Sequence, residues 1–293
     1  MYEIIKAKEL AASIIYFDVK APRVASRCLP GQFVIVRVDA QGERIPLTIC
    51  DYDREKGTVT IVIQTIGAQT TKMKALKEGD AFHDFVGPLG QPSEFCSEDP
   101  ETLKNKKIIF VAGGLGTAPV YPQVKWLSEH GVKADVIIGA KTKDLLILED
   151  EMKEVAGEVF PTTDDGSYGR SGMVTNTLKD LVEKEGHSYD VCVAIGPMIM
   201  MKFVCLTTKE LGIHTIVSMN PIMVDGTGMC GACRLTVDGQ VKFACVDGPE
   251  FDGHKVDFDQ AMKRMTIYKT AEGRALLKLQ EGDTHHGGCG QCN

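Results

Sequence analysis

The chain has 293 residues, 43% of them hydrophobic, and a formal net charge of −7. This length is enough to bury the cores of two compact domains with an appendage, and no apolar run is long enough to span a membrane. The negative charge, without a basic stripe carrying interleaved aromatic residues, excludes a nucleic-acid binder. The first ten residues, MYEIIKAKEL, lack the features of a secretory signal. We therefore expect a cytoplasmic protein that acts on small molecules and other proteins.

The first part of the chain, residues 1–100, has a sequence pattern that is typical of an antiparallel β-barrel. Short β-branched runs such as FVIVRVDA and GTVTIVIQTI alternate in polarity and are separated by Gly and Pro. The polar segment that follows, residues 93–107, resembles a linker. The sequence therefore predicts a barrel domain that ends near residue 100.

Residues 101–221 predict an α/β Rossmann-like domain with a parallel sheet. Apolar strands end in glycine turns and alternate with helical patterns, as in KIIFVAGG followed by APVYPQVKWLSEHG. The same alternation recurs as far as HTIVSMN, which is typical of parallel strands joined by crossover helices.

Two turns of this α/β domain are candidates for binding a dinucleotide. In AGGLGTAP the glycines follow a strand and open a helix, an arrangement that lets backbone approach a pyrophosphate at a helix N-terminus. The turn in AIGPM ends another strand at the carboxyl edge, where open α/β sheets bind ligands. Plain tight turns are the alternative explanation for both. The candidate residues are Gly113, Gly114, Gly116, Thr117, Gly196, Pro197 and Met198.

Ten cysteines fall into two classes. Five are isolated, and we interpret them as core or surface thiols in a reducing compartment: Cys28, Cys50, Cys96, Cys192 and Cys205. The other five lie toward the C-terminus around two C-x2-C pairs.

The segment 222–260 contains one of these pairs in VDGTGMCGACRLTVDGQVKFACVDG. Cys230, Cys233 and Cys245 have the spacing of a plant-type iron-sulfur loop, but Asp225 stands where the first thiolate is expected. The pattern leaves open a broken cluster site, a zinc ion held by three cysteines and an aspartate, or a [2Fe-2S] cluster with one oxygen ligand.

The last segment, residues 261–293, predicts a helical extension and a tail. Apolar residues recur at helical spacing near Met262 and Met265 and again near Leu276. The tail carries His285, His286, Cys289 and Cys292, a set that could bind zinc, although glycine-rich chain ends favour fortuitous binding over a structural site.

The order of these motifs resembles the ferredoxin-reductase superfamily. The resemblance runs through ERIPLTICD, TIGAQTTKMKALKEGD, VGPLG and GGLGTAP, and covers roughly residues 1–260. With the Asp/Cys loop added, the chain resembles the electron-transfer subunit of dihydroorotate dehydrogenase. It is more similar still to the small subunits of sulfide dehydrogenase and of NADH-dependent reduced ferredoxin:NADP oxidoreductase, particularly in CVDGPEFDGHKVDF.

The resemblance implies an FAD site in the barrel. Arg44 would pair with FAD phosphate, Thr48 would face the isoalloxazine, and Gln69 with Thr70 would donate to the pyrophosphate. One departure is that relatives often carry the arginine where this chain has Ile45. The implied flavin residues are Arg44, Pro46, Leu47, Thr48, Val62, Ile63, Gln64, Gly67, Gln69 and Thr70.

The resemblance also implies an oxidoreductase that links NAD(H), FAD and a [2Fe-2S] cluster to a larger flavin/iron-sulfur subunit in a heterodimer. The cluster ligands would be Asp225, Cys230, Cys233 and Cys245, and no protein acid, base or nucleophile is required. The alternatives are a dihydroorotate dehydrogenase electron-transfer subunit, whose usual four-cysteine pattern Asp225 contradicts, and a non-catalytic zinc-binding protein on a reductase scaffold.

Overall fold

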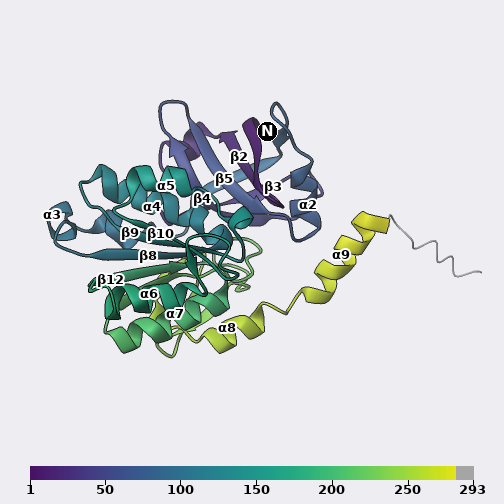
Figure 1. Cartoon of the computed structure of the whole chain (residues 1–293). Coiled ribbons are helices and arrows are strands. Elements are labelled where there is room, and N and C mark those ends of the chain that lie inside the picture. The colour runs from purple at the N-terminus through teal and green to yellow at the C-terminus, as the bar shows by residue number, and fades with distance from the viewer. Residues whose placement is uncertain (282–293) are drawn as a thin grey trace, which may run out of the picture.

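The computed structural model describes residues 1–281 and contains a β-barrel beside an α/β layer (Figure 1). The barrel sheet is antiparallel, with strand order β6-β1-β2-β5-β4-β3-β7. Its edge strands β6 and β7 are separated in the chain only by His83, so the two edges meet and the barrel nearly closes. This confirms the predicted antiparallel barrel. Its strands are β1 (Tyr2–Ala11), β2 (Ile14–Lys20), β3 (Phe33–Arg37), β4 (Ile45–Asp53), β5 (Thr58–Gln64), β6 (Ala81–Phe82) and β7 (Asp84–Leu89), with short helices α1 (Pro22–Ala25) and α2 (Ala68–Lys74).

The second sheet has the order β11-β10-β9-β8-β12-β13-β16 and is parallel from β11 to β13. Its parallel strands are β8 (Ile108–Gly113), β9 (Asp135–Ala140), β10 (Val159–Thr163), β11 (Arg170–Ser171), β12 (Val191–Ile195) and β13 (His214–Ser218). This arrangement confirms the predicted α/β layer.

Helices cover both faces of this sheet (Figure 1). α4 (Thr117–Glu129) and α5 (Glu149–Val155) pack on one face, whereas α6 (Val174–Glu183) and α7 (Met198–Leu211) pack on the other. Short 3-10 turns at Gly114–Gly116 and Lys143–Leu145 follow β8 and β9. The two faces therefore carry two separate apolar cores.

The segment predicted to be a linker is folded instead. It forms a 3-10 turn at Glu94–Ser97 and helix α3 (Pro100–Leu103), and Phe95 and Leu103 are fully buried. Both side chains pack into the core under α4, so they attach the segment to the α/β layer. The prediction was wrong because two buried apolar residues outweigh the polar residues around them.

After the parallel strands, the chain forms the candidate cluster subdomain. A hairpin of β14 (Arg234–Val237) and β15 (Gln240–Phe243) follows the Asp/Cys loop. β16 (Glu250–Asp252) then adds to the large sheet, antiparallel to β13, a connection that sequence reasoning missed. A 3-10 turn at Gly253–Lys255, helix α8 (Phe258–Arg264) and helix α9 (Lys269–Glu281) complete the described chain.

Helix α9 has no buried residue and lies beside α2 of the barrel (Figure 1). No helix within residues 1–281 is both long and apolar enough to cross a membrane.

Candidate functional site

The flavin region predicted from sequence lies on β4, β5 and the turn into α2. Thr48 pairs with Phe33 on the neighbouring strand, and its side chain is partly exposed. Val62 and Ile63 are buried, whereas Gln64 at the end of β5 is exposed. The β4 and β5 residues therefore lie on adjacent strands of one sheet, with Thr48 and Gln64 accessible to a ligand.

The turn into α2 has one feature that fits a polar ligand. The Oε1 atom of Gln69 is buried and has no hydrogen-bond partner within the described residues. Such an atom is costly unless a partner is supplied. Thr70 behaves differently, because its hydroxyl accepts hydrogen bonds from the backbone N–H groups of Ile66 (3.0 Å) and Gly67 (3.1 Å) and so caps its own helix.

Arg44 points toward the Asp/Cys loop. Its Nη2 donates a hydrogen bond to the backbone carbonyl of Asp225 over 3.3 Å, across 181 positions of the sequence. The predicted contact of Arg44 with FAD phosphate stays a prediction. The observed contact joins the barrel to the candidate cluster loop.

The glycines after β8 have different surroundings. A Cβ at Gly116 would lie 2.1 Å from the carbonyl oxygen of Ile195, and one at Gly113 would lie 2.3 Å from Met200 Sδ. Gly114 has φ +54° and nothing within 4 Å of an added Cβ. Gly116 therefore lets the turn after β8 approach β12, Gly113 lets the end of β8 approach a side chain of α7, and Gly114 has the conformation and the open space that a ligand needs.

The second predicted turn lies against the first. A Cβ on Gly196 would be 3.1 Å from the Cα of Gly113, so the ends of β8 and β12 touch at the carboxyl edge. Pro197 caps α7, whose first residue Met198 is buried. Thr117 is buried as well and donates to the carbonyl of Gly114 over 3.1 Å. The structure thus brings the predicted dinucleotide residues together.

The four predicted cluster ligands form two pairs. The Cys230 thiol donates to Oδ1 of Asp225 over 2.9 Å, and the sulfurs of Cys233 and Cys245 are 3.2 Å apart. Cys230 is exposed, whereas Cys233 and Cys245 are only 1% and 3% exposed. Two pairs of ligands are what a binuclear cluster with two protein ligands on each iron requires.

The electrostatics of the two pairs differ. The hydrogen bond from Cys230, with those from Thr227 and the Met229 backbone, lowers the pKa of Asp225 well below its ordinary value. Burial, with the adjacent Cys233 sulfur, raises the pKa of the Cys245 thiol to about 12. A thiolate at Cys245 therefore needs a cation beside it, which iron would supply.

The four side chains lie as two separate pairs and not as one group. Within residues 1–281, no three or more His, Cys, Asp or Glu side chains are placed together to hold a metal ion. The proposed zinc-binding set of the tail, His285, His286, Cys289 and Cys292, lies outside the described residues. The isolated cysteines Cys28, Cys50, Cys192 and Cys205 are free and buried, and Cys96 is free and partly buried, as predicted.

Several contacts that attach the cluster subdomain to the rest of the chain were missed from the sequence. Gln91 of the barrel donates from Nε2 to the carbonyl of Val246 (2.9 Å) and from its backbone to that of Gly248 (2.7 Å). On β16, the carboxylate of Glu250 accepts from Gln123 Nε2 of α4 over 2.7 Å. These contacts join segments that are far apart in the chain, so local sequence patterns do not predict them.

Glu250 has an unusual environment. Its Oε2 is buried without a hydrogen-bond partner within the described residues, and burial raises the pKa of its carboxyl to about 7. An added Cβ on Gly31 of the barrel would lie 3.1 Å from Glu250 Oε1. Glu250 therefore stands where barrel, α/β layer and cluster subdomain meet.

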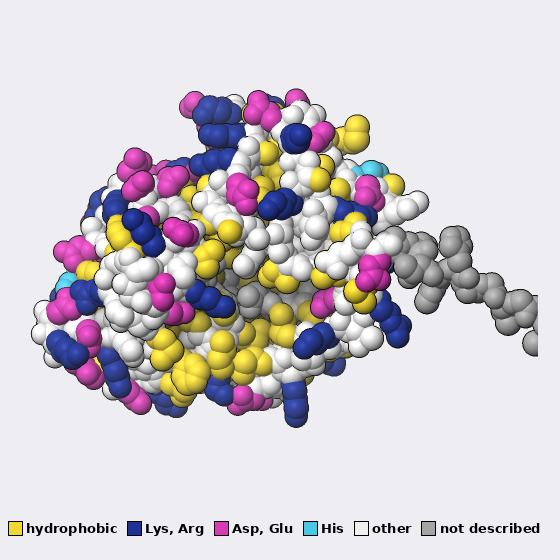
Figure 2. Space-filling model, turned by 45° about the vertical axis from the view of Figure 1, so that its right-hand side comes forward, with side chains coloured by type: hydrophobic (Ala, Val, Ile, Leu, Met, Phe, Trp, Pro, Cys, Tyr) yellow, Lys and Arg dark blue, Asp and Glu magenta, His cyan; other side chains and the backbone are white. Residues whose placement is uncertain are grey.

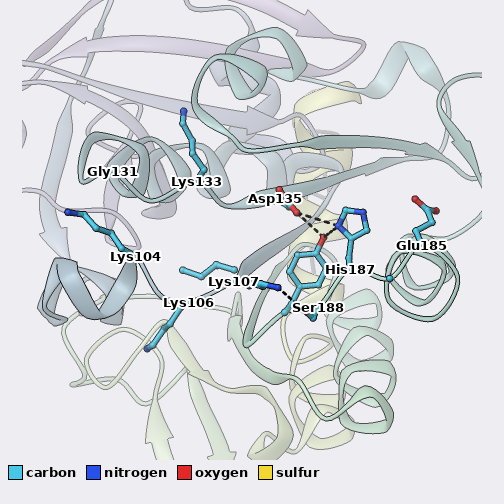
Figure 3. Close-up of a pocket in the computed structure, with 12 residues that line it drawn as sticks. Lys104, Lys106, Lys107, Gly131, Lys133, Asp135, Glu185, His187 and Ser188 are labelled. Carbon is cyan, nitrogen blue, oxygen red and sulfur yellow. Dashed lines mark hydrogen bonds and ion pairs between the residues drawn. The ribbon is translucent and has the colours of Figure 1, made fainter.

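A cavity of about 640 Å³ lies at the opposite, amino edge of the parallel sheet, beside the starts of β8, β9 and β12. Figure 3 shows that Lys104, Lys106 and Lys133 point away from one another, while Lys107 Nζ donates to Ser188 Oγ over 2.8 Å. The lysines do not converge on one ligand. The carboxyl edge therefore remains the candidate site.

Two domain models match parts of the chain that contain the candidate residues. The iron-sulfur cluster binding domain of dihydroorotate dehydrogenase B matches residues 220–257. The oxidoreductase NAD-binding domain matches residues 110–206. The candidate cluster loop and both turns at the carboxyl edge thus lie within matched domains.

The relatives match nearly the whole chain. An uncharacterized protein of Clostridium beijerinckii is 62% identical over 291 residues, which are 99% of this chain and 98% of that one. A homolog of the dihydroorotate dehydrogenase B (NAD(+)) electron transfer subunit from Thermotoga maritima is 47% identical over 270 residues, 92% of each chain. A chain in a structure of the NADH-dependent reduced ferredoxin-NADP oxidoreductase is 44% identical, with a TM-score of 0.87 and coverage of 96% of this chain and 98% of that one.

Proposed function

The chain belongs to the family of dihydroorotate dehydrogenase B electron-transfer subunits, and we propose that it carries electrons between NAD(H) and a larger flavin/iron-sulfur subunit. The observation that carries the proposal is the arrangement of Asp225, Cys230, Cys233 and Cys245 as two pairs. These four side chains would hold a [2Fe-2S] cluster with one carboxylate ligand.

FAD would lie in the barrel, between the dinucleotide and the cluster. When bound, FAD accepts a hydride as two electrons and releases them one at a time, as a one-electron iron-sulfur centre requires. Thr48 and Gln64 would face the flavin. The buried Oε1 of Gln69 is an acceptor, so it would gain its missing donor from a hydroxyl group of FAD and not from the pyrophosphate. The chain's residues bind and orient, so no protein acid or base takes part.

The dinucleotide would bind across the turns at the carboxyl edge. Gly114 leaves open space beside the start of α4, whose backbone N–H groups favour a phosphate. Pro197 and Met198 would lie on the other side of the dinucleotide. We propose NADH as the dinucleotide because a structure of the NADH-dependent enzyme holds such a similar chain.

Among complexes of this family, we propose the small subunit of an NADH-dependent reduced ferredoxin:NADP oxidoreductase. The 44% identity and the TM-score of 0.87 support it, as does Asp225 in place of the first cysteine. The dihydroorotate dehydrogenase subunit is the second candidate, favoured by the iron-sulfur domain match.

The exposed apolar surface supports a protein partner. Figure 2 shows hydrophobic side chains gathered on the lower part of one face, where α7 and α8 lie. Ile199, Phe203 and Leu206, spaced along α7, are each about half exposed. Met229 in the cluster loop is 90% exposed. Such apolar area is typical of protein interaction sites.

The test is to purify the chain with whatever subunit accompanies it. We expect one non-covalent FAD and one [2Fe-2S] cluster per chain, measured by chromatography after denaturing release and by iron and sulfide analysis. The isolated chain should oxidise NADH with an artificial acceptor but should not turn over dihydroorotate or ferredoxin. A folded chain without flavin, or with zinc in place of iron, would contradict the proposal.

A further inference from the structure

The two carboxylate oxygens of Asp225 are held differently. Oδ2 accepts from Thr227 Oγ1 over 2.8 Å and from the Met229 backbone over 3.1 Å. Oδ1 accepts from the Cys230 thiol over 2.9 Å. A metal-bound cysteine is a thiolate without that proton. With a cluster bound, Oδ1 would therefore lose its donor, whereas Oδ2 would keep both of its own.

We propose that Thr227 is a positioning residue that directs Oδ1 of Asp225 to iron and raises the reduction potential of the cluster. The inference rests on the proposed cluster ligands. A hydrogen bond to the second oxygen withdraws electron density from a carboxylate ligand, which weakens its donation to the metal. Weaker donation favours the reduced cluster, so the Thr227 hydroxyl makes one-electron reduction easier.

The loop backbone fixes where this hydroxyl lies. Gly226 has φ +77°, and an added Cβ would lie 3.0 Å from Ile35 Cγ1 of the barrel. Gly228 has φ +87°, and an added Cβ would lie 2.7 Å from Val246 Cγ2. Only glycine suits both positions. Thr227 lies between two glycines whose backbone conformation is restricted. The position of the Thr227 Cβ atom is therefore restricted as well.

Thr227 is exposed, and this makes the inference testable. Its methyl group fills no core, so replacing the hydroxyl by a methyl group changes little packing. What Thr227→Val removes is one charge-assisted hydrogen bond to Asp225. Thr227→Ser keeps the hydroxyl.

The experiment compares the holoprotein with Thr227→Val, Thr227→Ser and a control, Thr236→Val. Thr236 lies on β14 of the same subdomain and donates to Gln260 Oε1 over 2.6 Å, not to Asp225. The readouts are the midpoint potential of the cluster, titrated against a mediator, and its electron paramagnetic resonance spectrum after reduction by one electron. We expect Thr227→Val to lower the equilibrium constant for cluster reduction by up to about tenfold, which is 59 mV for a one-electron couple.

Thr227→Ser and Thr236→Val should both keep the wild-type midpoint potential of the cluster. The decisive variant is Asp225→Cys combined with Thr227→Val, because a thiolate has no second oxygen to accept the bond. Its potential should equal that of Asp225→Cys alone. A wild-type-like potential in Thr227→Val, an equal shift in Thr236→Val, or a full additional shift in the double variant would overturn the inference.

The inference can also be tested if Thr227→Val loses the cluster. If Thr227→Val fails to bind iron, the inference requires that Thr227→Ser and the double variant bind it. Iron missing from the double variant would make Thr227 a general support of the loop and overturn the positioning role. Wild-type iron and FAD, measured in the same preparations, test the proposed function separately.

Discussion

The two halves of the candidate cluster site differ in how the fold holds them. Cys233 and Cys245 belong to an apolar core that also includes Leu235 of the hairpin, and they are almost fully buried. Cys230 is exposed and Asp225 is partly exposed, and hydrogen bonds rather than packing fix the position of the Asp225 carboxylate. A carboxylate in place of a thiolate is thus found in the half where water can reach it.

This difference follows from the cost of burying polar groups. An ionised carboxylate in the place of Cys233 or Cys245 would need several donors in a pocket lined by apolar side chains. At position 225 the donors are already present as Thr227 and Met229. The buried half should therefore accept few substitutions, and the exposed half should tolerate them with a change in properties.

The largest effect is expected from Cys233→Ser. The variant should lose the cluster and its visible absorption, and its thermal stability should fall, because a hydroxyl is a poor iron ligand and costs about 1–3 kcal/mol when buried without a partner. Iron analysis and thermal unfolding monitor the two effects.

The matched control for this variant is Cys192→Ser. Cys192 is fully buried in β12, in the same apolar core, and so it should lose stability but keep its iron. Equal iron content in both variants would mean that the buried half is not a ligand pair.

The exposed half should respond to Asp225→Cys with a shift and not a loss. A softer, more strongly donating thiolate should keep the cluster and lower its potential, by an amount on the order of 100 mV. Asp225→Ala should weaken iron binding. Visible absorption and electron paramagnetic resonance measure both. Unchanged spectra in the two variants would make Asp225 a bystander and place the fourth ligand elsewhere.

Much of the fold, and the position of the candidate cluster loop, could be predicted from the sequence. The barrel and the α/β layer were predicted because alternating and continuous apolar runs report local burial, and the spacing from Asp225 to Cys245 marked the loop. The division into an exposed and a buried pair was not predictable. It depends on the partners of Gly226 and Val246 in the barrel, which lie more than a hundred residues away in the chain.

The contacts of Arg44 and Glu250 could not be predicted from the sequence for the same reason. Arg44 precedes a strand and resembles a phosphate-binding arginine in its motif, but its observed partner is the carbonyl of Asp225. Glu250 lies in a polar stretch that gives no sign of burial, and β16 buries it by joining the large sheet.

Glu250 tests how the buried half is supported, because β16 begins five residues after Cys245. Its pKa is about 7 in the folded protein and near 4.5 when unfolded, so the native state binds the proton more tightly. Stability from this group is present below pH 4.5 and is lost as the pH rises through 7. Glu250→Gln should remove this dependence. Its free energy of unfolding should exceed that of wild type by about 1 kcal/mol at pH 5 and by about 3 kcal/mol at pH 8.

Chemical unfolding at the two pH values checks this prediction, with Glu55→Gln as the control. Glu55 is exposed in the turn between β4 and β5, so its replacement should leave the pH dependence of wild type intact. A wild-type pH profile in Glu250→Gln would mean that the carboxyl is hydrated and supports nothing.

The smallest effect is expected from Arg44, which touches the exposed half with one hydrogen bond of 3.3 Å. Its positive charge beside the loop favours the more negative, reduced cluster, so Arg44→Gln should lower the cluster potential. Because the side chain is exposed, solvent limits the effect to at most about 1 kcal/mol, or about 40 mV for a one-electron couple. Arg44→Lys should keep the wild-type potential, and added salt should reduce the difference between the variants. If Arg44→Gln instead loses FAD at an unchanged cluster potential, the phosphate contact predicted from the sequence is its main role, and the exposed half is held from within its own loop.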